Sequence, residues 1–65
     1  MINHITRLTN ERGTHIQVFY SNGKVFRYSN YHMPNKKIPK TVLAIMNNAP
    51  YETKDTEFGK VEYFR

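Results

Sequence analysis

The sequence predicts an α+β fold. Three antiparallel strands form a meander, one helix packs on one face of it, and a C-terminal strand joins the sheet at an edge (βββαβ). Residues 1–29 alternate between apolar and polar side chains around two turn signals, residues 38–49 carry an apolar stripe with helical spacing, and the chain ends in the strand-like segment "KVEYFR". With 65 residues, positions 1–65 make one small domain.

The first predicted hairpin joins "INHITRLT" to "THIQVFY" through the turn "NERG". Asparagine starts turns well, and Gly13 tolerates a left-handed conformation, which predicts a type I turn closed by a glycine bulge. The resulting three-residue loop pairs Leu8 with Ile16 and Ile5 with Phe19.

The second predicted hairpin lies within "VFYSNGKVFRY". Its Asn-Gly pair favours a type I′ turn, because that turn needs positive φ at both central residues. A two-residue loop at this point pairs Tyr20 with Val25 and Phe19 with Phe26.

These two registers divide the side chains of the meander between two faces. The first face is aliphatic and carries Ile2, Leu8, Ile16, Val18, Tyr20 and Val25. The second face is aromatic and basic and carries Ile5, Arg7, His15, Gln17, Phe19, Lys24, Phe26 and Tyr28. A slip of one residue in the first strand would exchange its two faces.

The predicted helix follows a polar connection, "NYHMPNKKIP". Pro39 suits a first helical turn, and Pro50 stops the helix. The apolar stripe consists of Ile38, Val42, Ile45, Met46 and Ala49. A helix of about ten residues is not stable alone, so we expect it to lie on the aliphatic face.

The absence of cysteine excludes disulfides and thiolate metal sites and indicates a reducing, cytoplasmic location. No secretory signal pattern opens the chain, and its longest apolar run, residues 42–46, is far shorter than the ~20 residues that span a bilayer. We therefore expect no membrane partner.

No motif for catalysis or cofactor binding is present. His4, His15 and His32 lack the close spacing of zinc ligands, and the predicted register puts the first two on opposite faces. Asp55 and Glu57 lie in a tail with no enclosing cleft, and neither Gly-Lys pair has the upstream glycine of a phosphate loop. The sequence thus predicts a protein that is not an enzyme and has no cofactor or metal.

The charge indicates a polyanionic partner. The net charge is +5, and residues 1–49 hold seven basic residues and one acid. We therefore predict a small nucleic-acid-binding protein in which exposed rings stack on bases and cations meet phosphates. The predicted binding residues are Arg7, Phe19, Lys24, Phe26, Arg27, Tyr28, Lys36, Lys37 and Lys40. Of these, the predicted register turns Arg27 toward the helix, and the last three lie near the helix start, where a bound anion would relieve their repulsion with the helix dipole.

A basic three-stranded sheet backed by a helix resembles the arm-type DNA-binding domain of tyrosine recombinases. The resemblance is one of topology, and it implies a sheet lying in the major groove of DNA.

Other interpretations remain open from the sequence. Residues 51–65 could cover the rings and make a second small core, the rings could form a homodimer interface, and the charges could serve only solubility. The alternative function is a protein-binding inhibitor, encoded by a phage, that blocks a host enzyme or defence complex. Residues with A/T-rich codons are abundant, which indicates a phage or mobile-element origin. The chain would act as a monomer or homodimer.

Overall fold

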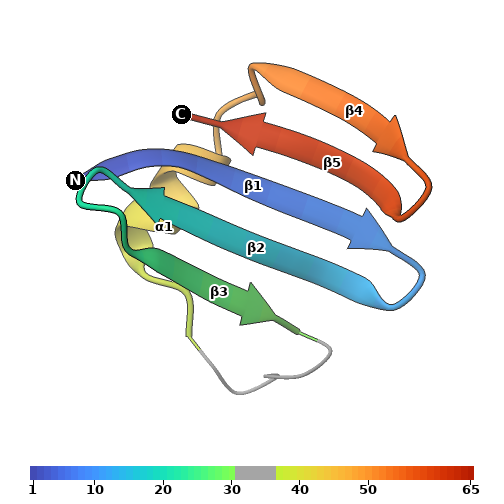
Figure 1. Cartoon of the computed structure of the whole chain (residues 1–65), viewed down its shortest axis with the longest axis horizontal. Helices are drawn as coiled ribbons and strands as arrows, with labels where there is room; N and C mark the ends of the chain where they lie inside the picture. The colour runs from blue at the N-terminus through green and yellow to red at the C-terminus, as the bar shows by residue number, and fades with distance from the viewer. Residues whose placement is uncertain (31–36) are drawn as a thin grey trace.

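The fold is a five-stranded antiparallel sheet with one short helix on one face (Figure 1). The structure, a computed structural model, describes residues 1–30 and 37–65. The elements in chain order are β1 (Ile2–Asn10), β2 (Gly13–Tyr20), β3 (Val25–Ser29), α1 (Lys40–Met46), β4 (Glu52–Thr56) and β5 (Gly59–Phe64). The strands are arranged in the order β3-β2-β1-β5-β4, so β1 is the central strand.

The predicted βββαβ fold is wrong, because the C-terminal segment forms a hairpin of two strands. β5 pairs with β1, and β4 becomes the new edge. The sequence of β4, "ETKDT", is exposed along its whole length and has no apolar face, so it lacks the alternation that marks a half-buried strand. A three-stranded sheet, on which the resemblance to the recombinase domain rested, is therefore not what this chain forms.

The loop of the first hairpin is one residue shorter than predicted. Asn10 pairs with Gly13, and two residues connect the strands. Ile5 therefore pairs with Val18 and not with Phe19. Both Ile5 and Val18 then point to the side of α1, where they are completely buried. Burial of these two aliphatic side chains favours the observed register over the predicted one.

The loop of the second hairpin is one residue longer than predicted. The Gly23 N–H donates a hydrogen bond to the Tyr20 carbonyl (3.0 Å), and the Tyr20 N–H donates to the Lys24 carbonyl (2.9 Å). Gly23 has φ +90°, whereas the asparagine before it does not have a positive φ, so the turn is not type I′. Phe26 consequently pairs with Val18 and lies on the side of α1.

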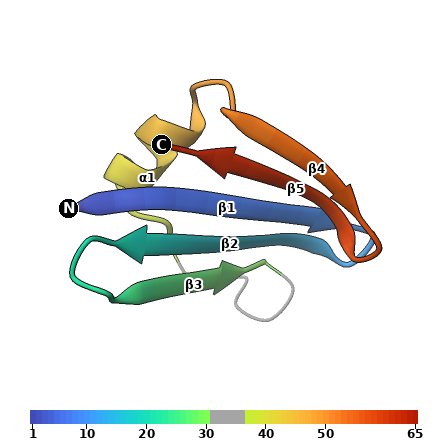
Figure 2. The same ribbon diagram turned by 45° about the horizontal axis from the view of Figure 1, so that its top comes forward.

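The core lies between α1 and one half of the sheet. Its buried side chains are Ile5, Ile16, Val18, Val42 and Phe64. Half-buried side chains pack around them, namely Ile2, Tyr20, Phe26, Tyr28, Ile38, Ile45 and Met46. The predicted helical stripe is confirmed at Val42, Ile45 and Met46, which lie on α1 and pack in the core. Ile38 also packs on the core but precedes the helix, and Ala49 follows the helix and is exposed. Figures 1 and 2 show α1 behind the end of the sheet where both termini lie, so the two hairpin turns at the other end extend past it.

One ion pair supports the sheet beyond the helix, on the same side as the core. The Arg7 Nε and Nη2 atoms each lie 2.9 Å from the Glu62 Oε1 atom. The Arg7 guanidinium carbon also lies 4.9 Å from the centroid of the Phe64 ring. The Arg7 and Glu62 side chains are 30% and 13% exposed, so water screens this pair only in part.

We expect Glu62→Gln to lower the free energy of unfolding by about 1–2 kcal/mol, because a half-buried guanidinium loses its charged acceptor. Urea unfolding followed by circular dichroism measures this loss. The matched control is Glu52→Gln, which removes an ion pair to Lys54 at 3.8 Å with side chains 49% and 57% exposed. An exposed pair of this kind contributes little, so the control should lose less than about 0.5 kcal/mol. Equal losses in the two variants would contradict the argument.

Candidate nucleic-acid interface

The face of the sheet opposite α1 is not covered by any element of the described residues (Figure 1). Side chains alternate along each strand, so the residues between the core positions point to this side. We call it the open face. It carries His4, Thr6, Leu8, His15, Gln17, Phe19, Val25, Arg27, Glu52, Lys54, Val61 and Tyr63.

The centre of the open face carries no carboxylate among the residues that line it. A shallow hollow of about 290 Å³ lies there, lined by Thr6, Leu8, His15, Gln17, Val61 and Tyr63. In the described parts of β2, β1 and β5, no aspartate or glutamate points to this face. A polyanion lying across these three strands would therefore meet no negatively charged side chain on them.

Two pairs of rings lie on or beside the open face. The Phe19 and His4 rings are stacked across β2 and β1, with centroids 4.4 Å apart and planes within 9° of parallel. The Tyr63 and Tyr51 rings lie at the opposite side, with centroids 6.2 Å apart and planes tilted by 47°. Flat rings in half-exposed positions offer surfaces on which further flat groups can stack.

Cations lie around these rings. The Lys54 Nζ atom is 5.7 Å from the centroid of the Tyr63 ring, and the Arg65 guanidinium carbon is 4.5 Å from the centroid of the Tyr51 ring. Arg27 is exposed on β3 at the other edge of the sheet. Cationic side chains thus lie on both sides of a centre without carboxylates, with Glu52 beside Lys54 at one edge.

The predicted aromatic and basic face does not exist as one surface. Phe19 and Arg27 lie on the open face, whereas Arg7, Phe26 and Tyr28 lie on the side of α1. The register of both hairpins differs from the predicted one by a single residue, and this slip separates the rings. Residues 51–65 do not cover the rings either, because they extend the sheet sideways.

The predicted lysines do not form one cluster with these residues. Lys24 is exposed in the turn before β3, and Lys37 and Lys40 are exposed at the start of α1. Lys36 lies outside the described residues. Because α1 has seven residues and no side-chain hydrogen bond at its N-cap, we assign no anion site there.

The histidines also differ from the prediction. His4 and His15 lie on the same face, not on opposite faces. His32 lies outside the described residues. Among the residues that the structure describes, no group of three or more His, Cys, Asp or Glu side chains is arranged to hold a metal ion. In the same residues, no helix is long and apolar enough to cross a membrane.

Sequence reasoning missed the tyrosines and cations of the C-terminal hairpin. Lys54 pairs across the hairpin with Val61, which is two residues from Tyr63 and therefore on the same face of the sheet. Arg65 directly follows the end of β5. Recognition of the turn "TEFG" would have placed Tyr63 and Lys54 on the same face. That turn was missed because the strand before it has no apolar residues.

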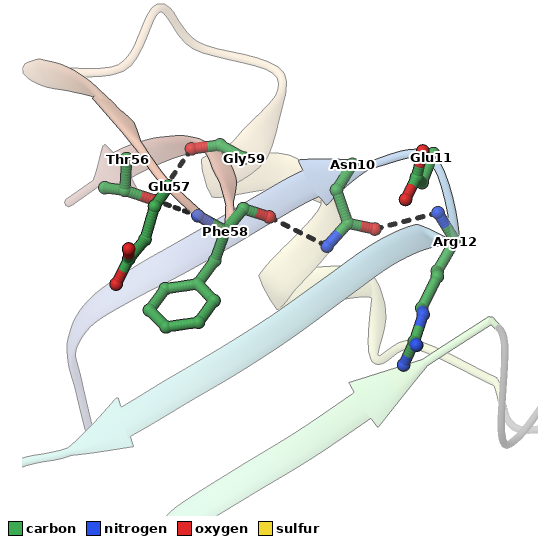
Figure 3. Close-up of a pocket in the computed structure, with 7 residues that line it drawn as sticks. All are labelled: Asn10, Glu11, Arg12, Thr56, Glu57, Phe58 and Gly59. Atoms are coloured by element: carbon green, nitrogen blue, oxygen red, sulfur yellow. Dashed lines mark hydrogen bonds between the residues drawn. The ribbon is translucent and has the colours of Figure 1, made fainter.

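A second feature is the end of the sheet where the β1–β2 and β4–β5 turns lie side by side (Figure 3). The Asn10 amide joins them, since its nitrogen donates to the Phe58 carbonyl (3.0 Å) and its oxygen accepts from the Arg12 N–H (2.9 Å). Within the second turn, the Thr56 hydroxyl donates to the Gly59 carbonyl (2.9 Å) and accepts from the Phe58 N–H (3.2 Å). The Phe58 ring projects from this network and is 69% exposed.

Comparison of the chain with protein-family models, with curated proteins and with solved structures found no match.

Proposed function

We propose that this protein is a non-enzymatic nucleic-acid-binding protein whose contact surface is the open face. The observation that carries the proposal is the combination of stacked rings, flanking cations and a centre without carboxylates on one uncovered sheet face. The net charge of +5 supports it, because a positive protein attracts a polyanion from a distance.

The rings on the open face and the cations on and beside it have defined parts in the proposed complex. Arg27, Lys54 and Arg65 neutralise phosphates, while Phe19 and Tyr63 stack on bases. Lys54 already lies near Glu52, but an exposed pair at 3.8 Å is weak enough for a phosphate to displace the carboxylate.

Binding should weaken steeply with salt. Neutralising about three phosphates releases their counterions, so log K should fall with log[salt] with a slope of about −2 to −3. Affinity for a labelled oligonucleotide should then fall about 15- to 65-fold between 50 and 200 mM salt. Fluorescence anisotropy across a salt series measures the slope. An affinity that hardly changes over this range, or no binding at 50 mM salt, would contradict the proposal.

The terminal hairpin offers a matched pair of lysines for the control. Lys54 lies on the open face, whereas Lys60 lies on the opposite face and pairs across the hairpin with Asp55. Lys54→Gln should reduce the salt slope by nearly one unit, and Lys60→Gln should leave it nearly unchanged. Both variants change the net charge equally, so a difference between them locates the contact surface.

The exposed Phe58 ring favours a second candidate function, namely protein binding. Exposed aromatic side chains held by a rigid backbone are typical anchors of protein interfaces. Glu11 and Glu57 lie in the two turns beside this ring and outnumber Arg12, the one cation among the residues that line the pocket there, so this end of the sheet attracts phosphates less than the open face does. A partner protein would accept the ring in an apolar socket with a basic rim.

A pull-down from nuclease-treated lysate distinguishes the two functions. Protein binding through this end predicts a stoichiometric partner that is retained by the wild type and by Phe19→Ala but is lost with Phe58→Ala. A partner retained equally by all three proteins would show that Phe58 is not the anchor.

A further inference from the structure

We infer that the open face binds single-stranded DNA in preference to duplex DNA. The inference rests on the proposed function and adds the class of nucleic acid. It depends on where the rings lie in the sheet: Phe19 is on β2 and Tyr63 is on β5, so both are interior to the edge strands.

The width of the sheet prevents these rings from reaching paired bases. Neighbouring strands lie about 4.8 Å apart, so the outer strands of this five-stranded sheet are about 19 Å apart. The major groove of B-DNA is about 12 Å wide, and the minor groove about 6 Å. A flat face of this width can touch the backbones of a duplex but cannot enter a groove, so its interior rings would contact no base edges.

Unpaired bases, in contrast, can lie flat against the same rings. Phe19 pairs with His4, and Tyr63 pairs with Thr6, two residues further along β1. From the strand spacing and rise, the two ring positions are about 12 Å apart, which a short oligonucleotide can bridge. A base next to Phe19 would extend the existing stack with His4. Base–aromatic stacking of this kind tolerates any sequence, because every base has a flat face.

Apolar side chains beside the ring positions favour DNA over RNA. Val25, which is 42% exposed, lies beside Phe19 at the sheet edge, and Leu8 and Val61 line the central hollow together with the polar Thr6, His15 and Gln17. A deoxyribose can pack on the three apolar side chains, whereas a ribose 2′-hydroxyl against them loses its water and regains a hydrogen bond only where it reaches one of the polar side chains.

The test compares three labelled probes at 50 mM salt by fluorescence anisotropy: an oligonucleotide of about 12 thymidines, its duplex with the complementary strand, and the matching uridine RNA. We expect the wild type to bind the single-stranded DNA at least about tenfold more tightly than the duplex and more tightly than the RNA. Phe19→Ala and Tyr63→Ala should each weaken single-stranded binding about 5- to 150-fold and leave duplex binding within about twofold.

Two controls separate loss of stacking from loss of folding. Phe58→Ala removes an exposed ring in the β4–β5 turn, outside the residues that define the open face, and should change single-stranded binding less than about twofold. Phe19→Leu keeps an apolar side chain but removes the ring, so it should still weaken single-stranded binding. Thermal unfolding of each variant shows whether the sheet is intact.

Several outcomes would overturn the inference. Duplex binding as tight as single-stranded binding, or Phe19→Leu binding as tightly as the wild type, would do so while leaving the proposed function in place. RNA binding more tightly than DNA would overturn the assignment to DNA. No binding of any probe would overturn the proposed function as well. A stable dimer in sedimentation velocity that neither binds the thymidine oligonucleotide nor dissociates in its presence would also overturn the inference, because a second copy would then occupy the open face.

Discussion

Phe64→Ala is expected to remove most of the stability of this protein. Phe64 is 1% exposed and lies on β5, paired with the completely buried Ile5. Truncation of a buried phenylalanine costs about 3–5 kcal/mol, which combines lost burial with the cavity left behind. A domain of this size has roughly 3–10 kcal/mol of stability in total. Urea unfolding at 25 °C should show a midpoint near zero denaturant or a substantially unfolded baseline.

Phe58→Ala is the matched control for this prediction. It makes the same chemical change six residues earlier in the chain, but the Phe58 side chain is 69% exposed, so its truncation leaves no cavity. Its free energy of unfolding should stay within about 0.5 kcal/mol of the wild-type value. If the two variants lost similar stability, the C-terminal hairpin would not dock on β1 as described.

Gly59→Ala is expected to have the second-largest effect. Gly59 has φ +134°, which alanine rarely adopts, and an added Cβ would clash with the Thr9 carbonyl oxygen and lie 2.9 Å from the Asn10 Cβ. Because the first of these atoms belongs to the backbone of β1, the strands must shift to relieve the clash. Strain and overpacking together should cost about 2–4 kcal/mol.

Gly23→Ala provides the comparison for this substitution. Gly23 also has a positive φ, +90°, but no heavy atom lies within 4 Å of an added Cβ. Only backbone strain remains, so we expect a loss of about 1–2 kcal/mol. The difference in the free energy of unfolding between the two variants, measured by thermal or urea unfolding, separates the cost of backbone strain from that of the steric clash. A larger loss for Gly23→Ala would contradict the close approach of β5 to β1.

The sequence predicts the positions of the first three strands and the helix better than it predicts their pairing. Alternation and helical spacing are local signals, and they marked "THIQVFY" and the stripe around Val42. Register depends instead on loop geometry, because one residue more or less in a turn moves every side chain of the strand to the other face of the sheet. The observed register of β1 and β2 is favoured by the burial of Ile5 and Val18 against a helix that is distant in the sequence. A pattern within one strand holds no information about this contact.

The candidate site was predictable only in part for the same reason. The sequence predicts Phe19 on the face away from the helix, and Phe19 does lie on the open face. Arg27 lies there too, although the predicted register turns it toward the helix. Phe26 was grouped with Phe19 because a two-residue turn would pair them, but the observed three-residue turn puts it on the side of α1. Tyr63 was overlooked because its strand pairs with one whose side chains are all charged or polar.

The central place of β1 also has a consequence for how the chain folds. One edge of β1 pairs with the next strand, whereas its other edge pairs with residues 60–64, which are more than fifty positions later in the chain. Such distant pairing raises the contact order and predicts folding on the order of milliseconds to seconds. Until β5 arrives, a growing polypeptide presents an unpaired β1 edge beside Ile5, an opening for aggregation that a chaperone could shield.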